Sequence, residues 1–455
     1  MRLSLPRNRA ERRGLRLWHV WIVLPLAFVA AIAIATGVFY TGWDLLGARE
    51  LKPERRIDSK TLFDLVKLSF GVVAGAGALV ALVVAYRRQR VDEEGALREA
   101  TRLHTERFTT AVSQLGDESA AVRLGGVHAL AGLADDAPTR DLRQTCIDVL
   151  CAYLRLPYIA DADLPAGDAV ARHAYLALRE VRHTVIRLIR DHLRLEPEHP
   201  HSWQGHDFDL TEVTFDGGDL SKAVFSGGRV SFRGAVFSAG SLDFGEAMFS
   251  GGTVDFSRAV FSEGTVNFDR ARFSGGTVNF ANARFSGGTV RFGGTTFSGG
   301  TVDFYAAEFS RGDVYFGSTN YGGTVFGTVF SEGTVWFNSA VFSGSSVSFD
   351  SAAFSGGTVH FNDAWFREGT VQFTRAVVTG GTVYFGGTVA SVSGGTVAGG
   401  ASFSGGTVWF NDAVFSGGTI DFSYATGAAP NGLPSSGGPL PAGLALPLAW
   451  HPAGS

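Results

Sequence analysis

The chain has 455 residues, enough for two or three domains, and it is rich in glycine, with 60, and in phenylalanine, with 37. Its net charge at neutral pH is −4, and residues 203–426 hold 19 acidic against 11 basic residues, which leaves +4 for residues 1–202. Because neither part is strongly basic, we expect no nucleic-acid partner.

Two apolar stretches near the N-terminus predict a membrane anchor. Residues 17–43 and residues 68–86 contain no Asp, Glu, Lys or Arg, and a helix needs roughly 20 apolar residues to cross a bilayer. Trp18 and Trp43 lie at the ends of the first stretch, as interfacial aromatic residues do. A signal peptide would also follow arginines, but the length of this stretch and the second one favour two transmembrane helices.

The flanking charges predict the orientation of these helices. Six arginines lie in the basic tail, residues 1–16, and three more follow the second stretch at Arg87, Arg88 and Arg90. The connecting loop, residues 44–67, holds six basic and five acidic residues. Basic residues near the ends of a span favour the cytoplasmic side of the membrane. We therefore expect both termini and the C-terminal part of the chain to lie in the cytoplasm, with the helices in the plasma membrane.

Small residues are spaced regularly in the second stretch. Gly71 and Gly75 lie on one face of a helix, and Gly77 adds a further small residue; two small residues spaced by four are a pattern that lets transmembrane helices approach closely. The spacing is compatible with a homodimer through Gly71 and Gly75, and equally with a Gly- and Ala-rich helix that has no such partner.

Residues 87–202 predict a small all-α linker or adaptor domain. Apolar residues recur at spacings of three and four over 92–158, with a turn signal at 135–138, and again over 169–195. The last helix is expected to point its arginines outward, into solvent or toward anionic lipid headgroups. These arginines are Arg179, Arg182, Arg187, Arg190 and Arg194.

Cysteines and histidines in this helical part invite a chemical interpretation. Cys146 and Cys151 are five residues apart in a predicted helix, so their side chains diverge by roughly 140° and we expect buried thiols without a disulfide. His199, His201 and His206 are close in sequence, but their spacing matches no zinc pattern. We therefore expect no metal site.

The remaining chain is a repeat. Phenylalanine returns every twelve residues from Phe225 to Phe309, and a second set runs from Phe232 to Phe316 at the same period, offset by seven. Residues 210–230 show a shorter spacing of five between apolar centres, with small or branched residues at many of the positions two before them. A period sustained over this length indicates a stack of near-identical structural units.

The spacing of five at Leu210, Phe215, Leu220 and Phe225 resembles the pentapeptide-repeat family. Together with two apolar spans and a helical middle, the chain is similar to the membrane-anchored pentapeptide-repeat proteins of actinobacteria. The resemblance covers roughly half of the chain. It implies a right-handed parallel β-solenoid over residues 203–426, in which each central Leu or Phe and the residue two before it point into the core.

The later unit, A-x-F-S-G-G-T-V-x-F-x-x, departs from the strict period of five. Two units could close a four-sided coil of 24 residues, which we favour, or a single unit could close a flatter two-sided coil of 12. Residues 203–426 would form about nine coils in the first case and about eighteen in the second. At a strand spacing of about 4.8 Å the solenoid would then be about 45 Å or about 90 Å long. Either way we expect Ala259, Phe261, Val266 and Phe268 inside, and a positive φ in the corner at Gly275–Gly276.

The repeat is interrupted near residues 321–330 and near 389–403. We expect loops or register shifts there, which are candidate contact points for a partner, although repeat decay without consequence would look the same. Residues 427–455 form a Gly-, Pro- and Ala-rich tail without acidic or basic residues. We expect residues 444–451 to cover the apolar end of the last coil.

The repeat carries no recognisable catalytic constellation. Its histidines, His206 and His360, have no repeated partner, and Val254 stands where calcium-binding β-helix repeats require glycine. We therefore predict no enzyme, cofactor or metal, and a membrane-anchored, non-enzymatic scaffold or protein-interaction module. The alternative, implied by the resemblance, is a DNA-mimic modulator of a type II topoisomerase, for which a net charge of −8 over residues 203–426 is mild.

Overall fold

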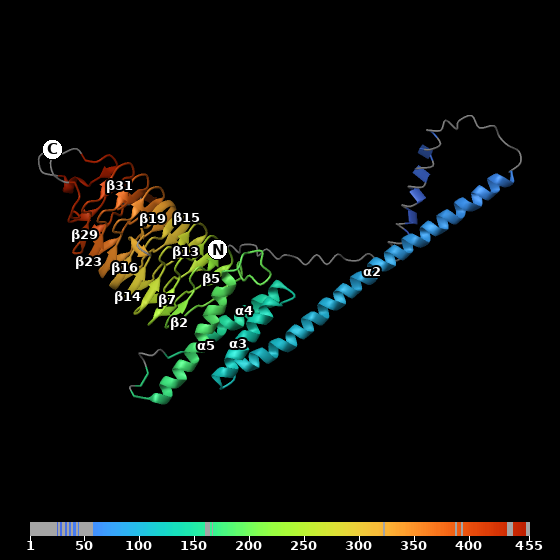
Figure 1. The fold of residues 1–455 in the computed structure, drawn as a ribbon. Helices are drawn as coiled ribbons and strands as arrows, with labels where there is room; N and C mark the ends of the chain where they lie inside the picture. Colours follow the sequence, from blue (N-terminus) through green and yellow to red (C-terminus); the bar gives the residue numbers. More distant parts are fainter. Residues whose placement is uncertain are drawn as a thin grey trace. The chain divides into compact units, whose positions relative to one another are not determined.

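The computed structural model describes residues 25, 28–29, 32–33, 36–37, 40–41, 44, 58–159, 164–165, 167–321, 324–386, 389–392, 395–434 and 440–451. The chain divides into two compact units, residues 1–102 and residues 103–455 (Figure 1). The helical residues that follow Arg102 belong to the same unit as the repeats.

The described part of the first unit consists mainly of the long helix α2 (Ser59–Leu115), which continues into the second unit. The second predicted span, residues 68–86, lies within α2, and most of the first, residues 17–43, lies outside the described residues. Large apolar side chains of α2, such as Leu68, Phe70 and Leu82, are exposed. Within the part of the chain that the structure describes, no helix combines the length and apolar character needed to cross a membrane.

Three helices follow in the second unit. They are α3 (Ala120–Asp135), α4 (Arg140–Leu154) and α5 (Ala169–Leu193). The break between α3 and α4 confirms the turn predicted at residues 135–138. Side-chain oxygens of Thr139 and Asp168 accept hydrogen bonds from the first amides of α4 and α5 and so set the starts of these helices. Gly126 allows α3 to lie directly against α2, because a Cβ there would come within 2.6 Å of the amide nitrogen of Leu115.

Residues from Phe208 onward form a right-handed parallel β-solenoid with two long sheets and two hairpins (Figure 1). Sheet 1 contains β1 (Phe208–Asp209), β4 (Val224–Phe225), β5 (Arg229–Ser231), β8 (Met248–Phe249), β9 (Thr253–Asp255), β12 (Arg272–Phe273), β13 (Thr277–Asn279), β15 (Thr296–Asp303), β19 (Val329–Trp336), β21 (Ala353–Phe354), β22 (Thr358–His360), β24 (Val377–Val378), β25 (Thr382–Tyr384), β30 (Val414–Phe415), β31 (Thr419–Asp421) and β33 (Leu444–Ala445). Sheet 2 contains β2 (Thr214–Phe215), β3 (Gly218–Asp219), β6 (Val236–Phe237), β7 (Ser241–Asp243), β10 (Val260–Phe261), β11 (Thr265–Asn267), β14 (Arg284–Arg291), β16 (Glu308–Tyr315), β20 (Val341–Ser348), β23 (Trp365–Gln372), β28 (Ser402–Phe403), β29 (Thr407–Trp409) and β32 (Thr426–Gly427). The hairpins are β17 (Thr319–Tyr321) with β18 (Thr324–Phe326), and β26 (Val389–Val392) with β27 (Gly395–Ala398).

The strand register establishes the length of a coil. Phe237 pairs with Phe261, and Phe261 pairs with Phe285, so neighbouring coils are offset by 24 residues. Each such coil contributes two short strands to each sheet, for example β10 and β11 to sheet 2 and then β12 and β13 to sheet 1. From β14 onward the two short strands of a sheet often merge into one strand of eight residues. The register therefore supports the 24-residue coil and contradicts the alternative of 12.

The core of the solenoid consists of phenylalanine columns. Ala259, Phe261, Val266 and Phe268 are at most 3% exposed, which confirms the predicted inward positions. Within a column the rings stack almost parallel from one coil to the next, as Phe268 does with Phe292 at a centroid distance of 4.8 Å. Neighbouring columns meet edge to face, an arrangement that aromatic rings prefer.

The two corner types explain the unusual sequence of the repeat. Gly276 has a φ of 68°, which confirms the prediction of a positive φ, and a Cβ there would come within 2.6 Å of the carbonyl oxygen of Gly252 in the preceding coil. The other corner, Phe-x-x-Ala, is a β-turn closed by a bond from Ala259 N to Phe256 O. Its third residue, Arg258 in this coil, also has a positive φ.

Both ends of the solenoid are covered. At the N-terminal end, Ile186 of α5 packs against Gly218, and the buried residues of the helices and of the solenoid form one continuous core. At the C-terminal end, β33 pairs with β31, and the Trp450 ring lies 5.5 Å from that of Phe422. This contact agrees with the cover expected from residues 444–451, since an open coil would expose its phenylalanines to water.

Candidate functional site

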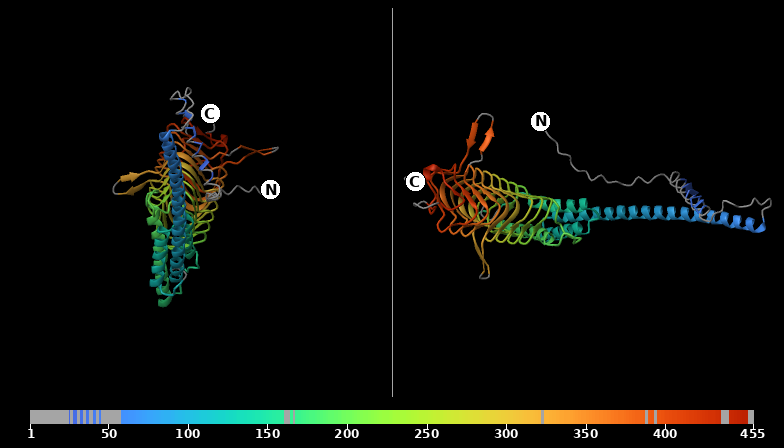
Figure 2. Two further views of the ribbon diagram at one scale, coloured as in Figure 1. Left: turned by 90° about the vertical axis from the view of Figure 1, so that its right-hand side faces the viewer. Right: turned by 90° about the horizontal axis from the view of Figure 1, so that it is seen from above.

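Two hairpins interrupt the solenoid, and they are its most prominent external features. β17–β18 lies in the turn that leads from sheet 2 to sheet 1, whereas β26–β27 lies in the opposite turn, from sheet 1 to sheet 2. The hairpins, coloured gold and orange, therefore extend from opposite edges, as Figure 2 shows. Among the described residues, each hairpin pairs only with itself and forms a separate two-stranded antiparallel sheet.

The hairpins are insertions of defined length. Phe297 pairs with Phe330, a separation of 33 residues instead of 24, so the first insertion adds nine residues. Phe366 pairs with Phe403, a separation of 37, so the second adds thirteen. The columns continue across both insertions, and the prediction of loops or shifts near residues 321–330 and 389–403 is therefore confirmed.

The base of the first hairpin presents apolar side chains. Val325 is 66% exposed and Phe326 is 38% exposed. The guanidinium of Arg270, two coils earlier on the same edge, lies 5.8 Å from the centre of the Phe326 ring, within the range of a cation–π interaction. Arg270 also forms an ion pair with Glu246. This edge therefore combines an exposed aromatic ring with charged groups.

A second polar region lies where α5 meets the first coil. Arg182 is 3% exposed and donates to the carbonyl oxygens of Leu154 and Thr214, each at 2.7 Å. The expected outward placement of the α5 arginines is therefore wrong for most of them. Three others contact the solenoid through Asp216, Asp219 and Ser221, and Arg187 remains exposed.

Asp216 is the centre of this junction and is only 4% exposed. The Tyr158 and Tyr175 hydroxyls donate to its Oδ2 at 2.5 and 2.7 Å, and Arg179 Nε donates to the same oxygen at 3.1 Å. His183 Nε2 lies 3.1 Å from Oδ1. Burial by itself would raise the pKa of Asp216, but the hydrogen bonds from these groups outweigh it and hold the pKa well below its usual range.

The two tyrosines respond in the opposite direction. Burial and the nearby carboxylate raise the pKa of Tyr175 to about 12 and also raise that of Tyr158. Both hydroxyls therefore remain protonated donors at neutral pH. The repeat pattern did not predict this cluster. One signal in the sequence was that Asp216 precedes a Gly pair where the later units have serine, as at Ser226 and Ser250.

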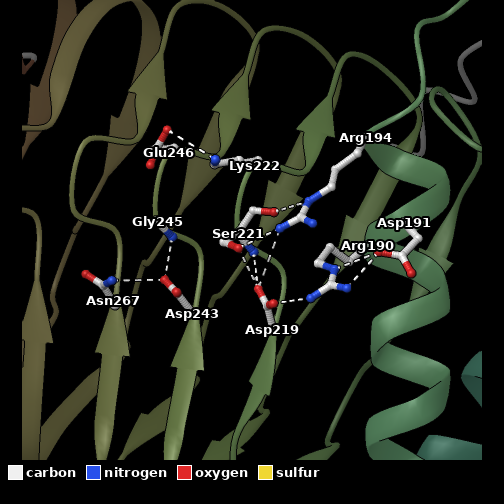
Figure 3. A network of polar contacts seen from close by, with 10 residues as sticks. All are labelled: Arg190, Asp191, Arg194, Asp219, Ser221, Lys222, Asp243, Gly245, Glu246 and Asn267. Carbon is white, nitrogen blue, oxygen red and sulfur yellow. Dashed lines mark hydrogen bonds and ion pairs between the residues drawn. The ribbon is translucent and has the colours of Figure 1, made fainter.

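From this junction a polar ladder continues over the outside of the solenoid (Figure 3). Arg190 bridges Asp191 and Asp219, and Arg194 donates to Ser221. The next coil follows with Lys222 3.9 Å from Glu246, and with Asp243 accepting a hydrogen bond from Asn267 at 2.9 Å. Lys222 and Glu246 lie in equivalent positions of successive coils, as do Asp243 and Asn267, so these two contacts join coil to coil.

The histidine-rich segment does not converge on one point. His201 Nδ1 lies 3.8 Å from Oδ2 of Asp135. His192 also contacts Asp135, and its ring stacks on that of Trp203 at a centroid distance of 4.0 Å. His206 is buried separately, and neither of its ring nitrogens has a hydrogen-bond partner. Within the described residues no group of three or more His, Cys, Asp or Glu side chains is arranged to hold a metal ion.

The two cysteines are free and buried, as predicted. Burial raises the pKa of Cys146 to about 11 and that of Cys151 to about 12. Because the thiolate is the reactive form, both thiols are inert at neutral pH. The sulfur of Cys146 lies 3.8 Å from His104 Nε2.

Comparison with known proteins adds no identity to this geometry. No family model matches the sequence, and no curated protein matches it significantly. The structure itself establishes a parallel β-solenoid of about nine coils with regularly stacked phenylalanines, joined to a small helical region.

Proposed function

We propose that the chain is a membrane-anchored, non-enzymatic scaffold of the pentapeptide-repeat type, which binds a protein partner through its two hairpins. The observation that carries this proposal is the pair of insertions, β17–β18 and β26–β27, in an otherwise continuous array. A two-stranded sheet is marginally stable by itself, and its free edges are templates for an added strand. A partner strand on either hairpin would supply the missing hydrogen bonds.

The composition of the second hairpin supports the same function. Natural proteins protect exposed edge strands with charged residues or proline. Residues 386–401, which contain the hairpin, include neither. We therefore interpret β26–β27 as a strand pair kept available for a partner.

Deletion of each insertion tests the proposal without disturbing the coils. Removing residues 319–327 joins Ser318 to Thr328 and restores the Phe-x-x-Thr turn, and removing 387–399 restores Phe-x-x-Ala in the same way. Affinity capture from membranes should recover a stoichiometric partner with the intact chain and lose it with one or both deletions. Capture that is equal in all variants would contradict the role of the hairpins, provided that circular dichroism shows intact solenoids.

The membrane anchor is part of the proposal. Its support is the absence of Asp, Glu, Lys and Arg from residues 17–43 and 68–86, and the exposure of apolar side chains along α2. A topology reporter after Ser455 and a second one after Glu50 should place the C-terminus in the cytoplasm and the loop outside. A soluble chain, or an exterior C-terminus, would contradict the proposed localisation at the plasma membrane.

A homodimer through the second span is proposed with the anchor. Among the described residues, no atom lies within 4 Å of a Cβ added at Gly71 or Gly75, so this face of α2 has room for a second helix. Replacing Gly71 and Gly75 by leucine should abolish cross-linking between copies in membranes, and unchanged cross-linking would exclude this contact.

The DNA-mimic alternative receives no specific support from the structure. Carboxylates of the solenoid are paired with arginines, for example Asp269 with Arg291 at 3.1 Å and Asp350 with Arg375 at 2.8 Å. Such pairing reduces the negative potential that a DNA mimic needs. If the chain inhibited supercoiling by a type II topoisomerase at micromolar concentration, this alternative would replace the scaffold proposal.

A further inference from the structure

A cavity of about 430 Å³ lies between α5 and the first coils, next to the Asp216 cluster. One face of α5 provides four basic side chains to its wall, because residues 179, 183, 187 and 190 recur at spacings of four, four and three. The opposite wall consists of Gly217, Gly218, Asp219 and Ser241. From this arrangement we infer that the cavity binds a phosphate group.

Among the side chains that line the cavity, the basic ones outnumber the carboxylates. Asp216 is contacted by four donor groups, and its side chain is only 3% exposed. It therefore lies beneath the wall of the cavity and does not line it. Asp219 is the carboxylate that lines the cavity, and Arg190 pairs with it. Arg187 is exposed and donates to the hydroxyl of Thr184, and among the described residues no carboxylate forms an ion pair with it.

The geometry also holds the basic groups in place before a ligand arrives. Asp216 fixes Arg179 and the His183 ring from one side, and Asp191 and Asp219 fix Arg190 from the other. Arginine forms pairs of parallel hydrogen bonds with phosphate oxygens, and a preorganised guanidinium loses little entropy when it does so. Arg187 then supplies the charge that is not yet paired.

A second cavity differs from this one in the charges of its lining residues. That cavity, of about 630 Å³, lies on the other side of the first coil and is lined by both carboxylates and arginines, including Asp148, Asp209, Arg229 and Arg233. Its mixed walls favour neither sign of charge. Of these two cavities, the one beside α5 is lined by more basic than acidic side chains.

Titration of the purified full chain with inorganic phosphate tests the site. Bound phosphate stabilises the folded chain, so the melting temperature should rise with phosphate in a saturable way. Arg187→Gln should weaken binding about tenfold or more. It should not lower the melting temperature in phosphate-free buffer, since within the described part of the chain the polar contact of Arg187 is its hydrogen bond to the Thr184 hydroxyl. Arg311→Gln, which removes another exposed arginine, from β16, should bind phosphate as the unchanged chain does.

A second arm of the experiment distinguishes the source of the phosphate group. Binding to phosphatidylcholine vesicles is compared with binding to vesicles that also contain phosphatidic acid. Arg187-dependent binding of free phosphate supports a soluble phosphoryl ligand, and Arg187-dependent binding to the phosphatidic acid vesicles alone supports a lipid headgroup. Absence of binding in both arms, or equal binding by Arg187→Gln and Arg311→Gln, would overturn the inference.

Discussion

The buried carboxylate of Asp216 gives the sharpest prediction about how the helices hold the solenoid. Asp216→Asn keeps the shape of the side chain and removes its charge, while Arg179 and His183 remain beside it. Removing one partner from a buried ion pair costs about 3–5 kcal/mol, and because Arg179 is itself 38% exposed we expect the lower end of this range, about 3 kcal/mol. The matched control is Asp219→Asn, three residues away, whose ion pair with Arg190 involves a carboxylate that is 45% exposed. Such an exposed pair contributes about 0–1 kcal/mol.

Hydrogen exchange measures this difference locally. In Asp216→Asn the amides of α5 and of the first coil should exchange about a hundredfold faster or more, since 1.4 kcal/mol corresponds to a factor of ten. Coils around residues 330–385 should exchange as before, because each repeat contacts mainly its neighbours. Asp219→Asn should change exchange only slightly. Equal effects of the two substitutions, or faster exchange throughout the solenoid, would refute the assignment of Asp216 as the buried junction.

The same residue predicts how the junction responds to acid. The folded pKa of Asp216 lies below its usual value, so its contribution to stability is complete above the unfolded pKa of about 3.9 and is lost as the pH falls toward the folded pKa. Protection of α5 should therefore decrease on acidification below about pH 4. In Asp216→Asn this part of the pH dependence should be missing.

Three further predictions concern the core, the corners and a histidine. Phe280→Ala, at a fully buried ring with stacked neighbours on both sides, should lower the free energy of unfolding by about 3–5 kcal/mol in chemical denaturation; a loss below about 1 kcal/mol would contradict the packing. Gly276→Ala should destabilise by more than about 1 kcal/mol, because its φ is 68° and the added Cβ would meet Gly252 O, and an unchanged melting temperature would refute this. Burial by itself would lower the pKa of His192, but its hydrogen bonds to Asp135 and to the Leu188 carbonyl outweigh burial and raise the pKa. The contribution of His192 to stability should therefore be fully present below the unfolded pKa of about 6.5 and decrease as the pH rises through the folded pKa. In His192→Gln this part of the pH dependence of stability should be missing.

The repeat was predictable because its physics is local. Each coil repeats the same inward Phe and Ala or Val. The periodicity, together with strand alternation and the resemblance to the pentapeptide-repeat family, therefore predicted Ala259 and Phe261 as core residues and a positive φ at the Gly275–Gly276 corner. Coil length was left open, because a unit of twelve residues fits both coil types. Only the register, in which Phe261 pairs with Phe285, distinguishes them.

The junction was not predictable from the sequence pattern. The helical spacing of α5 indicates which residues share a face, but not which of two polar faces the solenoid covers. Tyr158 and Tyr175 reach Asp216 across 58 and 41 residues, and no periodicity connects such positions. The interruptions of the repeat were visible, but their antiparallel pairing as hairpins follows from backbone hydrogen bonds between segments without the repeat pattern.

Site-specific photo-cross-linking in membranes tests the central claim most directly. A photoreactive amino acid is placed at Val325, which is 66% exposed at the first hairpin, or at Val414, which is 49% exposed on the solenoid wall. We predict that position 325 gives a covalent adduct of one defined mass with a partner protein, and that position 414 gives none. No adduct at position 325, or the same adducts at both positions, would contradict the proposal that the hairpins bind the partner.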